Sequence, residues 1–513
     1  MTIPDLAVVT PWLRRWGYAS GLAVVFALAA GVRLALTLRT PGGLFGLGIY
    51  DDGVHFAAAV GLVNGLMPYR DFLLLHPPGV VLALAPFAAL SRLVGEPGAV
   101  AVARLCWMVL GGLNAVLCGL VLRPIGRVAG LVAALFYALF LGATYVEYAP
   151  LLESPATTVL LAALVVTRLL GSGAGIGRRH YLLAGALLGL SPVLKIWGVV
   201  AVLVVVGTII ARRGRRPGLL TLGAALASTA ALCLPFFVAA PAQMWRMVVV
   251  AQLGRRRGDW ATAQRLNDVL GIRFWVGAQP TVQALTVVAI SVVLAALTIC
   301  LLRPALRVIA ALLLTHGAIV LLAPMWFLHY AGLTAAPIAL ALGGAVGATI
   351  DWSDRVQRRP WVGWVVASLV VTATFGLALS LPRWHFGNPA FPGPTLAAGV
   401  ANRPGCVASD WPMTLIQMDA LQRNLDRGCP LVVDIGGYSY YLVDSEYSDV
   451  SRRRNHDFQA ILLEYYRSAD AVLPVRFTTQ SGYSRATAKE IASWPVVAKA
   501  GRYVIRAPQP EAR

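Results

Sequence analysis

Side chains that could do chemistry gather in the first polar loop of the chain. Two carboxylates, Asp51 and Asp52, follow the first long apolar run, and His55 comes one helical turn later. Further along the loop, His76 precedes Pro77-Pro78-Gly79 at the start of another apolar segment. Carboxylates and imidazoles can be ligands for a hard cation or for zinc, but the loop has no compact ligand spacing of that kind.

The acidic pair also has a purely structural explanation. An aspartate before a helix accepts hydrogen bonds from the free N–H groups and complements the helix dipole. Residues 53–66 are moderately apolar and suit a helix that lies along the membrane surface, so Asp51 and Asp52 could simply cap it. A doubled aspartate at the exit of a membrane helix, followed by His55, favours function over capping.

The elements that position these residues are membrane helices. The 513 residues are 58% hydrophobic and 13% charged, with a mean hydropathy of +0.70, whereas soluble proteins carry about 25% charged residues. The net charge of +20 does not indicate nucleic-acid binding, because many basic residues form short clusters between apolar runs, such as Arg212 to Arg216. Such clusters are typical of cytoplasmic loops.

The positive-inside rule gives the orientation. Arg14 and Arg15 precede the first apolar run, which has no clear cleavage site, so the N-terminus is expected in the cytoplasm and the loop from Thr40 outside. If residues 77–94 span the membrane, the arginine clusters of five later loops fall outside. If residues 77–94 are in-plane or re-entrant, those clusters are all cytoplasmic. We therefore expect an external loop at 40–98 with in-plane helices.

These assignments predict a polytopic α-helical membrane protein with about eleven transmembrane helices and a small C-terminal extracytoplasmic α/β domain. The membrane domain is expected at 1–382 and the C-terminal domain, called the tail, at 383–513. The expected spans are 17–39, 99–122, 128–147, 155–170, 181–194, 196–211, 218–240, 282–302, 305–323, 331–350 and 361–381.

Within the tail, three patterns predict local structure. The short apolar run 430–434 indicates a buried strand, 457–468 has helical spacing, and 496–505 could form a hairpin around Gly501. Cys406 and Cys429 could form a disulfide if the tail is exported.

With this topology, polar residues from several loops converge on the external face. Charges at helix ends in one compartment are costly unless they pair or function. The set comprises Asp51, Asp52, His55, His76, Glu147, Glu153, Lys195, Arg255, Arg256, Arg257, His329 and Tyr330.

Several members of this set have structural alternatives. Glu153 could cap the helix that follows it, with Pro155 in the first turn. Lys195 could extend to the membrane interface, and the arginines at 255–257 could bind lipid headgroups. His329 and Tyr330 could belong to an interfacial belt.

At these residues the chain resembles the membrane-embedded C-type (GT-C) glycosyltransferases, which include protein O-mannosyltransferases and aminoarabinose transferases. The acidic pair and surface helix of that superfamily are matched by Asp51-Asp52-Gly53-Val54-His55-Phe56, and its Pro-Pro motif by His76-Pro77-Pro78-Gly79. Leu151-Leu152-Glu153-Ser154-Pro155 is similar to a later acidic element, with Glu in place of the usual Asp. Lys195, Tyr330 and Pro337 match more loosely.

This resemblance covers residues 40–340. The second acid of the pair is Asp52 where the superfamily often has Glu, which leaves its role open. The tail is not the large carbohydrate-binding domain of well-known members and is similar to the small extracytoplasmic tails of actinobacterial members.

The resemblance implies a sugar donor carried on a polyprenyl monophosphate and an inverting transfer to a cell-envelope glycan, lipid or protein on the external face. Asp51 would be the general base, with Asp52 or His55 orienting it or binding the acceptor. Lys195 and an arginine of 255–257 would neutralise the leaving phosphate. Glu153 would contact the acceptor or, like Asp52, hold a divalent cation. The remaining substrate-binding candidates are His76, His329 and Tyr330.

Two other functions compete with this one. A lipid-linked polysaccharide polymerase or ligase would release a diphosphate and depend on arginines more than on a carboxylate. A transporter or flippase of lipid-linked sugars would need polar residues at mid-membrane depth, for which Arg33 and Arg104 are the candidates.

Overall fold

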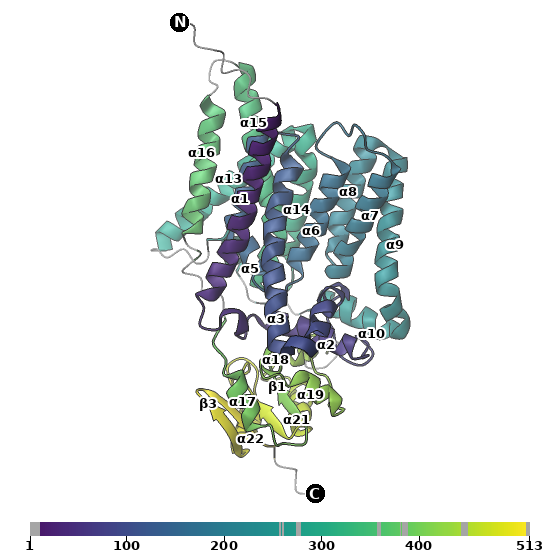
Figure 1. Cartoon of the computed structure of the whole chain (residues 1–513), viewed down its shortest axis with the longest axis vertical. Helices are drawn as coiled ribbons and strands as arrows, with labels where there is room; N and C mark the ends of the chain where they lie inside the picture. The colour runs from purple at the N-terminus through teal and green to yellow at the C-terminus, as the bar shows by residue number, and fades with distance from the viewer. Residues whose placement is uncertain are drawn as a thin grey trace.

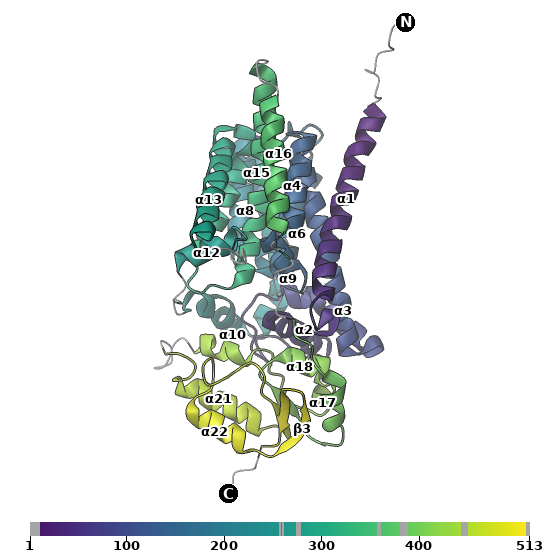
Figure 2. The same cartoon turned by 90° about the vertical axis from the view of Figure 1, so that its left-hand side faces the viewer.

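A computed structural model shows a bundle of long helices with a mixed segment of helices and strands at one end (Figure 1). The structure describes residues 11–508 except 256–257, 259–260, 273–278, 357–360, 380, 382–387 and 443–449. The tail lies below the bundle, and the described chain begins at the opposite end (Figures 1 and 2).

Each expected span lies on helical structure. The bundle consists of α1 (Pro11–Leu38), α3 (Gly79–Leu122), α4 (Arg127–Leu139), α5 (Leu141–Glu147), α6 (Glu153–Thr167), α7 (Arg178–Leu194), α8 (Gly198–Arg213), α9 (Arg215–Ala239), α13 (Gln279–Leu302), α14 (Arg307–Leu322), α15 (Gly332–Val356) and α16 (Trp361–Ala378). Among the described residues, seven helices are long and apolar enough to cross a membrane, or eight if the bent pair α4–α5 is one span. The protein is thus a multi-pass membrane protein, and the count of eleven stays a prediction.

Two boundaries differ from those expected. The segments 77–94 and 99–122 are joined in α3, which has a kink at Gly95, where φ is +74°. Glycine adopts this left-handed conformation without steric cost. The expected span 128–147 is broken at Phe140, where α4 and α5 meet at 59°.

Four loops that carry arginine clusters, those between α3 and α4, α6 and α7, α8 and α9, and α13 and α14, lie at the end of the bundle opposite the tail (Figures 1 and 2). Two of these loops touch: Arg212 donates a 2.6 Å hydrogen bond to the carbonyl of Leu169, and Arg213 donates a 2.5 Å bond to that of Ser172. Basic loops and tail are therefore separated by the bundle, as the positive-inside argument requires. Which end faces the cytoplasm stays a prediction.

Arg33 and Glu147 form a buried ion pair between α1 and α5. The Arg33 Nη2–Glu147 Oε2 distance is 2.5 Å, and both side chains are fully buried. The other carboxylate oxygen of Glu147 accepts hydrogen bonds of 2.7 Å from Asn114 and Tyr137. Glu147, expected on the external face, is therefore a buried residue that holds α1 and α5 together. Because Arg33 is its partner, Arg33 is not available to a transported solute.

The helix expected along the membrane surface is instead buried. It is α2 (Tyr50–Val63), and every residue from Asp52 to Gly61 is buried. It packs against α3 on one side and, on another, against α18 (Pro412–Gln417) of the tail. Coverage by the tail explains why this segment is apolar on more than one face.

Short helices connect these elements. They are η1 (Gly43–Phe45), α10 (Pro241–Trp245), η2 (Arg246–Val250), α11 (Ala251–Leu253), α12 (Thr262–Val269), η3 (Pro304–Leu306) and η4 (Leu328–Ala331).

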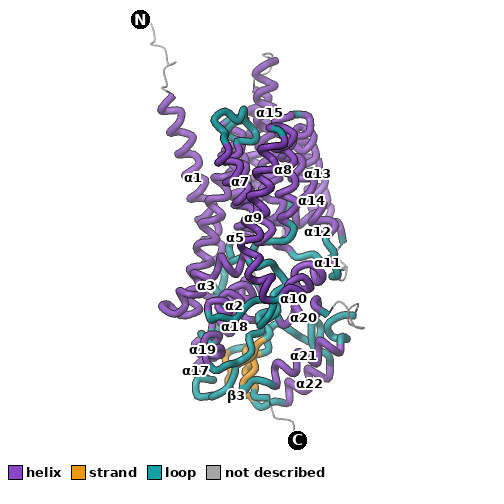
Figure 3. Tube along the Cα trace, turned by 90° about the vertical axis from the view of Figure 1, so that its right-hand side faces the viewer, coloured by secondary structure: helices purple, strands orange, loops and turns teal. Residues whose placement is uncertain are grey.

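The tail contains a four-stranded sheet with helices around it (Figure 3). The strands are β1 (Val407–Ser409), β2 (Ala471–Leu473), β3 (Val496–Ala500) and β4 (Tyr503–Arg506), in the order β1-β2-β4-β3. β1 and β2 are parallel, and the other two pairs are antiparallel. The remaining helices are α17 (Gly393–Gly399), α19 (Leu421–Asp426), η6 (Ile435–Gly437), α20 (Tyr438–Tyr441), α21 (His456–Arg467) and α22 (Arg485–Ser493).

Two of the three local predictions for the tail are confirmed. α21 covers the expected helix, and β3 and β4 form the hairpin around Gly501, whose φ is +57°. The strand at 430–434 is wrong, because this segment forms no strand. Leu431 is buried because it packs with the apolar residues of α2 rather than inside the sheet.

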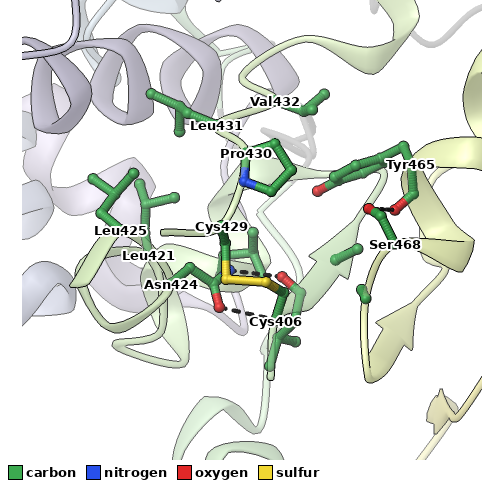
Figure 4. A pocket seen from close by; sticks show the side chains of 14 residues that line it. Cys406, Leu421, Asn424, Leu425, Cys429, Pro430, Leu431, Val432, Tyr465 and Ser468 are labelled. Carbon is green, nitrogen blue, oxygen red and sulfur yellow. Dashed lines mark hydrogen bonds between the residues drawn. A yellow bond between two sulfur atoms is a disulfide. The ribbon is translucent and has the colours of Figure 1, made fainter. Parts of the chain in front are cut away.

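Cys406 and Cys429, the two tail cysteines expected to pair, form a disulfide with their Cα atoms 5.8 Å apart (Figure 4). The bridge ties the start of β1 to the segment after α19. Asn424 supports the same junction, because its side-chain amide donates to Val407 O at 2.7 Å and accepts from Val407 N at 3.1 Å.

Candidate active site

A polar pocket lies where the helical bundle meets the tail. Five residues singled out from the sequence line it, namely Asp51, His76, Arg255, His329 and Tyr330. The other lining residues are Tyr50, Leu75, Phe327, Asp434, Tyr440, Arg452 and Arg476. The pocket therefore joins α2, the loop before α3, the loop after α11, η4 and the tail.

The two aspartates at the start of α2 have different surroundings. Successive residues of a helix point about 100° apart, so Asp51 faces the pocket while Asp52 faces the bundle. The Asp51 side chain is 31% exposed, and its Oδ2 lies 3.5 Å from His329 Nδ1. Neither aspartate caps the helix, because the N-cap residue is Ile49 and it makes no side-chain cap hydrogen bond. The pocket geometry thus leaves Asp51 as the carboxylate that a substrate can reach.

Asp52 pairs with Arg104 of α3. The Arg104 Nη2–Asp52 Oδ2 distance is 2.7 Å, and the two side chains are 2% and 0% exposed. Arg104 also donates to the carbonyls of Leu44 and Gly46 at 2.7 and 2.9 Å. Burial raises the pKa of Asp52 to about 6, and the neighbouring Arg104 opposes that rise. The pair fixes the loop before α2, so Asp52 positions Asp51 and does not line the pocket.

Gly48 is required where this loop crosses the ion pair. Its φ is +65°, and a Cβ there would lie 2.3 Å from Arg104 Nη2 and 2.4 Å from Asp52 Oδ2. Any larger residue would displace one of the two charged groups. The loop can pass this close only because the position has no side chain.

Behind the pocket, His329 connects Asp51 to a second buried ion pair. His329 Nε2 lies 3.9 Å from Glu153 Oε1, and the same oxygen accepts a hydrogen bond from Lys195 Nζ. Lys195 also lies 4.2 Å from the centroid of the Tyr330 ring, at cation–π distance. Glu153 and Lys195 are thus buried supports of His329 and Tyr330, one layer away from the pocket.

His55 and His76 pack edge to face with ring centroids 5.5 Å apart. His55 Nδ1 lies 3.1 Å from the carbonyl of Pro150, and because a carbonyl only accepts, this nitrogen carries the proton. Burial lowers the pKa of both imidazoles, and for His76 the nearby His55 and Arg255 add to the effect. Both rings are neutral at pH 7, and only His76 lines the pocket.

Arg255 brings a positive charge to the pocket. Its Nη1 donates to the Tyr330 hydroxyl at 3.3 Å, and its guanidinium carbon lies 4.8 Å from the centroid of the Tyr440 ring. Its Nε is buried without a hydrogen-bond partner among the described residues. Arg256, predicted beside it, lies outside the described residues.

The carboxylates considered as metal ligands do not fit that role. Asp52 faces Arg104 and Glu153 faces Lys195. In the part of the chain that the structure describes, no three His, Cys, Asp or Glu side chains come together in a group that could hold a metal ion. The described residues of the pocket therefore offer no set of side chains that could hold a divalent cation.

The tail residues of the pocket were not foreseen from the sequence. Tyr50 donates a 2.8 Å hydrogen bond to Asp434, and Arg476 stacks on Tyr50 with its guanidinium carbon 3.2 Å from the ring centroid. Tyr440 lies on α20, and Arg452 lies in the turn before α21. Their sequence signal is an aromatic run and an arginine cluster, neither of which indicates contact with the start of α2, which comes much earlier in the chain.

No protein-family model matches this sequence, and no curated protein matches it. Among solved structures, ArnT from Cupriavidus metallidurans in the apo state superposes with a TM-score of 0.58 at 14% identity, over 96% of this chain and 98% of ArnT. The oligosaccharyltransferase AglB from Archaeoglobus fulgidus gives 0.57 at 11% identity, over 90% of this chain and 70% of AglB. The chain has the GT-C fold.

A third GT-C structure, the arabinofuranosyltransferase AftD from mycobacteria, gives a TM-score of 0.51 at 18% identity. The alignment covers 98% of this chain and 40% of AftD. The resemblance inferred from the acidic pair and the Pro-Pro motif is thereby confirmed at the level of the fold. At these identities the comparison gives the GT-C architecture and leaves the reaction to be argued from the pocket.

Proposed function

We propose that this protein is a membrane glycosyltransferase that moves a sugar from a polyprenyl monophosphate to a cell-envelope glycan, lipid or protein, with inversion at the anomeric carbon. The observation that carries the proposal is the placement of a partly exposed carboxylate, Asp51, in the same pocket as Arg255 and Tyr330. A base and a phosphate-binding group are the two parts that such a transfer needs.

Asp51 is the general base in this mechanism. It takes the proton of the acceptor hydroxyl while the hydroxyl oxygen attacks the anomeric carbon, and the bond from that carbon to the phosphate oxygen breaks. A single displacement of this kind inverts the anomeric configuration. His329, 3.5 Å from Asp51, orients the carboxylate, and Asp52 with Arg104 fixes the backbone that presents it.

Arg255 and the Tyr330 hydroxyl stabilise the departing phosphate. The guanidinium is always charged and can form two parallel hydrogen bonds to phosphate oxygens. Lys195, assigned this role from the resemblance, is held by Glu153 and acts through the Tyr330 ring instead.

A large apolar groove supports a lipid-linked donor. It has a volume of about 460 Å³ and is lined by apolar residues of α4, α13, α15 and α16 and by Leu270 and Ile272. Near Leu270, Asp268 accepts a 2.7 Å hydrogen bond from Trp326, whose ring packs against Tyr330 of the pocket. A neighbouring GT-C structure, ArnT, is described bound to undecaprenyl phosphate. A polyprenyl chain in this groove would bring its phosphate towards Tyr330.

The proposal includes the location of the reaction. The pocket would open on the external side, with residues 1–382 as the membrane domain and 383–513 as an extracytoplasmic α/β domain carrying the disulfide. A cysteine introduced at Gly126, in the end of the bundle opposite the tail, should not react with an impermeant reagent in intact cells. Rapid labelling there would reverse the orientation.

A panel of synthetic sugar donors tests the reaction. Purified protein should release polyprenyl phosphate from at least one polyprenyl-monophosphate sugar and give a product of inverted configuration. Turnover of diphosphate donors alone would favour a polymerase or ligase. The transporter alternative is less well supported, because its two candidate residues are held in buried ion pairs, Arg33 with Glu147 and Arg104 with Asp52.

A further inference from the structure

The tail wall of the pocket carries two arginines that the proposed mechanism does not use. The guanidinium carbon of Arg476 lies over the Tyr50 ring, and its Nη1 is buried without a hydrogen-bond partner among the described residues. Arginine stays protonated at all accessible pH values, so an unsatisfied buried N–H of this group is costly. A guanidinium left in this state points to a ligand that supplies the missing acceptor.

Arg452 is held in place beside it. Its Nε donates to Ser439 Oγ at 2.9 Å and its Nη2 to the carbonyl of Gly436 at 3.3 Å. The guanidinium carbons of Arg452 and Arg476 each lie 5.6 Å from the Phe477 ring centroid. The two groups are thus arranged around one aromatic ring, and a fixed arrangement of this kind lowers the entropic cost of binding an anion.

Among the described residues, the carboxylates of the pocket form no ion pair with either arginine, although Asp434 and Asp51 help to stabilise the charge of Arg476 from a greater distance. Asp434 accepts hydrogen bonds of 2.8 Å from Tyr50 and from the backbone N–H of Gly437, and Asp51 faces His329. Within the described residues, neither arginine forms an ion pair with a carboxylate. By contrast Arg467, on the surface of the same tail, pairs with Glu490 at 2.8 Å.

The pair is also distinct from the arginine that serves the leaving group. Tyr440 is shared between the two walls, with Arg255 at 4.8 Å and Arg452 at 5.2 Å from its ring centroid. Arg255 contacts Tyr330 of the bundle, whereas Arg476 stacks on Tyr50, the neighbour of Asp51. The tail arginines therefore lie on the side of the residue that deprotonates the acceptor.

We propose that Arg452 and Arg476 bind a second oxyanion, a phosphate or carboxylate carried by the acceptor, and that the tail thereby selects anionic acceptors. This inference rests on the proposed function only in calling the ligand an acceptor, because the anion site itself can be measured without turnover.

The test uses the full-length protein in detergent, with decaprenyl phosphate and radiolabelled inorganic phosphate as probes. In wild-type protein saturated with decaprenyl phosphate, inorganic phosphate should still bind. Substituting Arg452→Gln and Arg476→Gln together should weaken this binding at least about tenfold, because hydrogen bonds from a charged donor are stronger than those from a neutral one. The matched control Arg467→Gln should leave phosphate binding unchanged. Arg476→Lys keeps a positive charge at this position, so it should bind inorganic phosphate more tightly than Arg476→Gln does.

Three results would overturn the inference. Inorganic phosphate could fail to bind once decaprenyl phosphate is present, which would mean that both probes share one site. The double substitution could leave the binding of inorganic phosphate intact. It could also weaken the binding of decaprenyl phosphate as strongly as that of inorganic phosphate, which would assign these arginines to the donor. None of these results bears on whether Asp51 is needed for transfer, so the failure of this inference and the failure of the proposed function remain separate.

Discussion

Neutralising Arg104 is expected to destabilise the protein strongly, because it leaves the carboxylate of Asp52 buried without its counter-charge. The two side chains are almost completely buried and 2.7 Å apart. Removing one partner of such a pair costs about 3–5 kcal/mol, whereas replacing both by neutral groups costs less. Arg104→Gln also removes the donor that holds the carbonyls of Leu44 and Gly46, so we expect the upper part of this range.

A double-mutant cycle measures the pair directly. The free energy of unfolding of Arg104→Gln, Asp52→Asn and the double variant would be measured by denaturant titration in detergent micelles. The double variant should recover part of the loss, with a coupling energy of about 2–3 kcal/mol, near the upper end of the range for residues in contact.

Additive effects would refute this reasoning. If the double variant loses the sum of the two single losses, the ion pair does not hold the loop before α2. The positioning role of Asp52 would then be wrong even if Asp51 is catalytic.

Three further predictions follow from the same region and from the tail. Gly48→Ala should destabilise the protein by more than the roughly 1–2 kcal/mol of left-handed backbone strain, because the added Cβ would clash with Arg104 and Asp52. Gly43→Ala is the matched control, because Gly43 has a φ of +52° and an added Cβ there would have no atom within 4 Å. Equal shifts of the unfolding temperature in the two variants would contradict the clash. Folding raises the pKa of Asp52 from 3.8 to about 6, so the stability gained from protonating this carboxyl is fully present below pH 3.8 and is lost as the pH rises through about 6. Over this pH window the unfolding midpoint of wild-type protein should fall relative to that of Asp52→Asn. Parallel pH curves for the two proteins would contradict the shift. Reduction of the Cys406–Cys429 disulfide should destabilise the tail by about 3 kcal/mol. Alkylation after reduction should then give a mass shift for both cysteines. Two free thiols in protein isolated from the membrane would rule out the disulfide.

The sequence was sufficient for features that depend on local pattern. Long apolar runs gave helices at every expected span, because hydropathy and helical length are properties of one segment. The hairpin around Gly501 was found for the same reason. The same reasoning gave a wrong strand at 430–434, because the apolar side chain of Leu431 packs against α2 and not within a sheet. The strands β1 and β2 have three residues each and are too short to show a period-two pattern.

The site was predictable only in part. Asp51, His329 and Tyr330 could be grouped, because positive-inside topology places their loops in one compartment. The separation of Asp51 from Asp52 depends on Arg104, which the sequence shows only as a charge inside a span. The tail wall depends on docking between distant segments, such as the approach of Met413 to Gly53, and no local pattern encodes it.

The most direct test of the central claim is the turnover of Asp51→Asn. Asparagine keeps the shape of the side chain but cannot take a proton, so sugar transfer from a polyprenyl-phosphate donor should fall by about 10²–10⁴-fold, with expression and thermal stability unchanged. Asp426→Asn, at an exposed carboxylate of the tail that accepts a hydrogen bond from Gln422, is the matched control and should retain full activity. Turnover of Asp51→Asn equal to that of wild-type protein would contradict the assignment of Asp51 as the base.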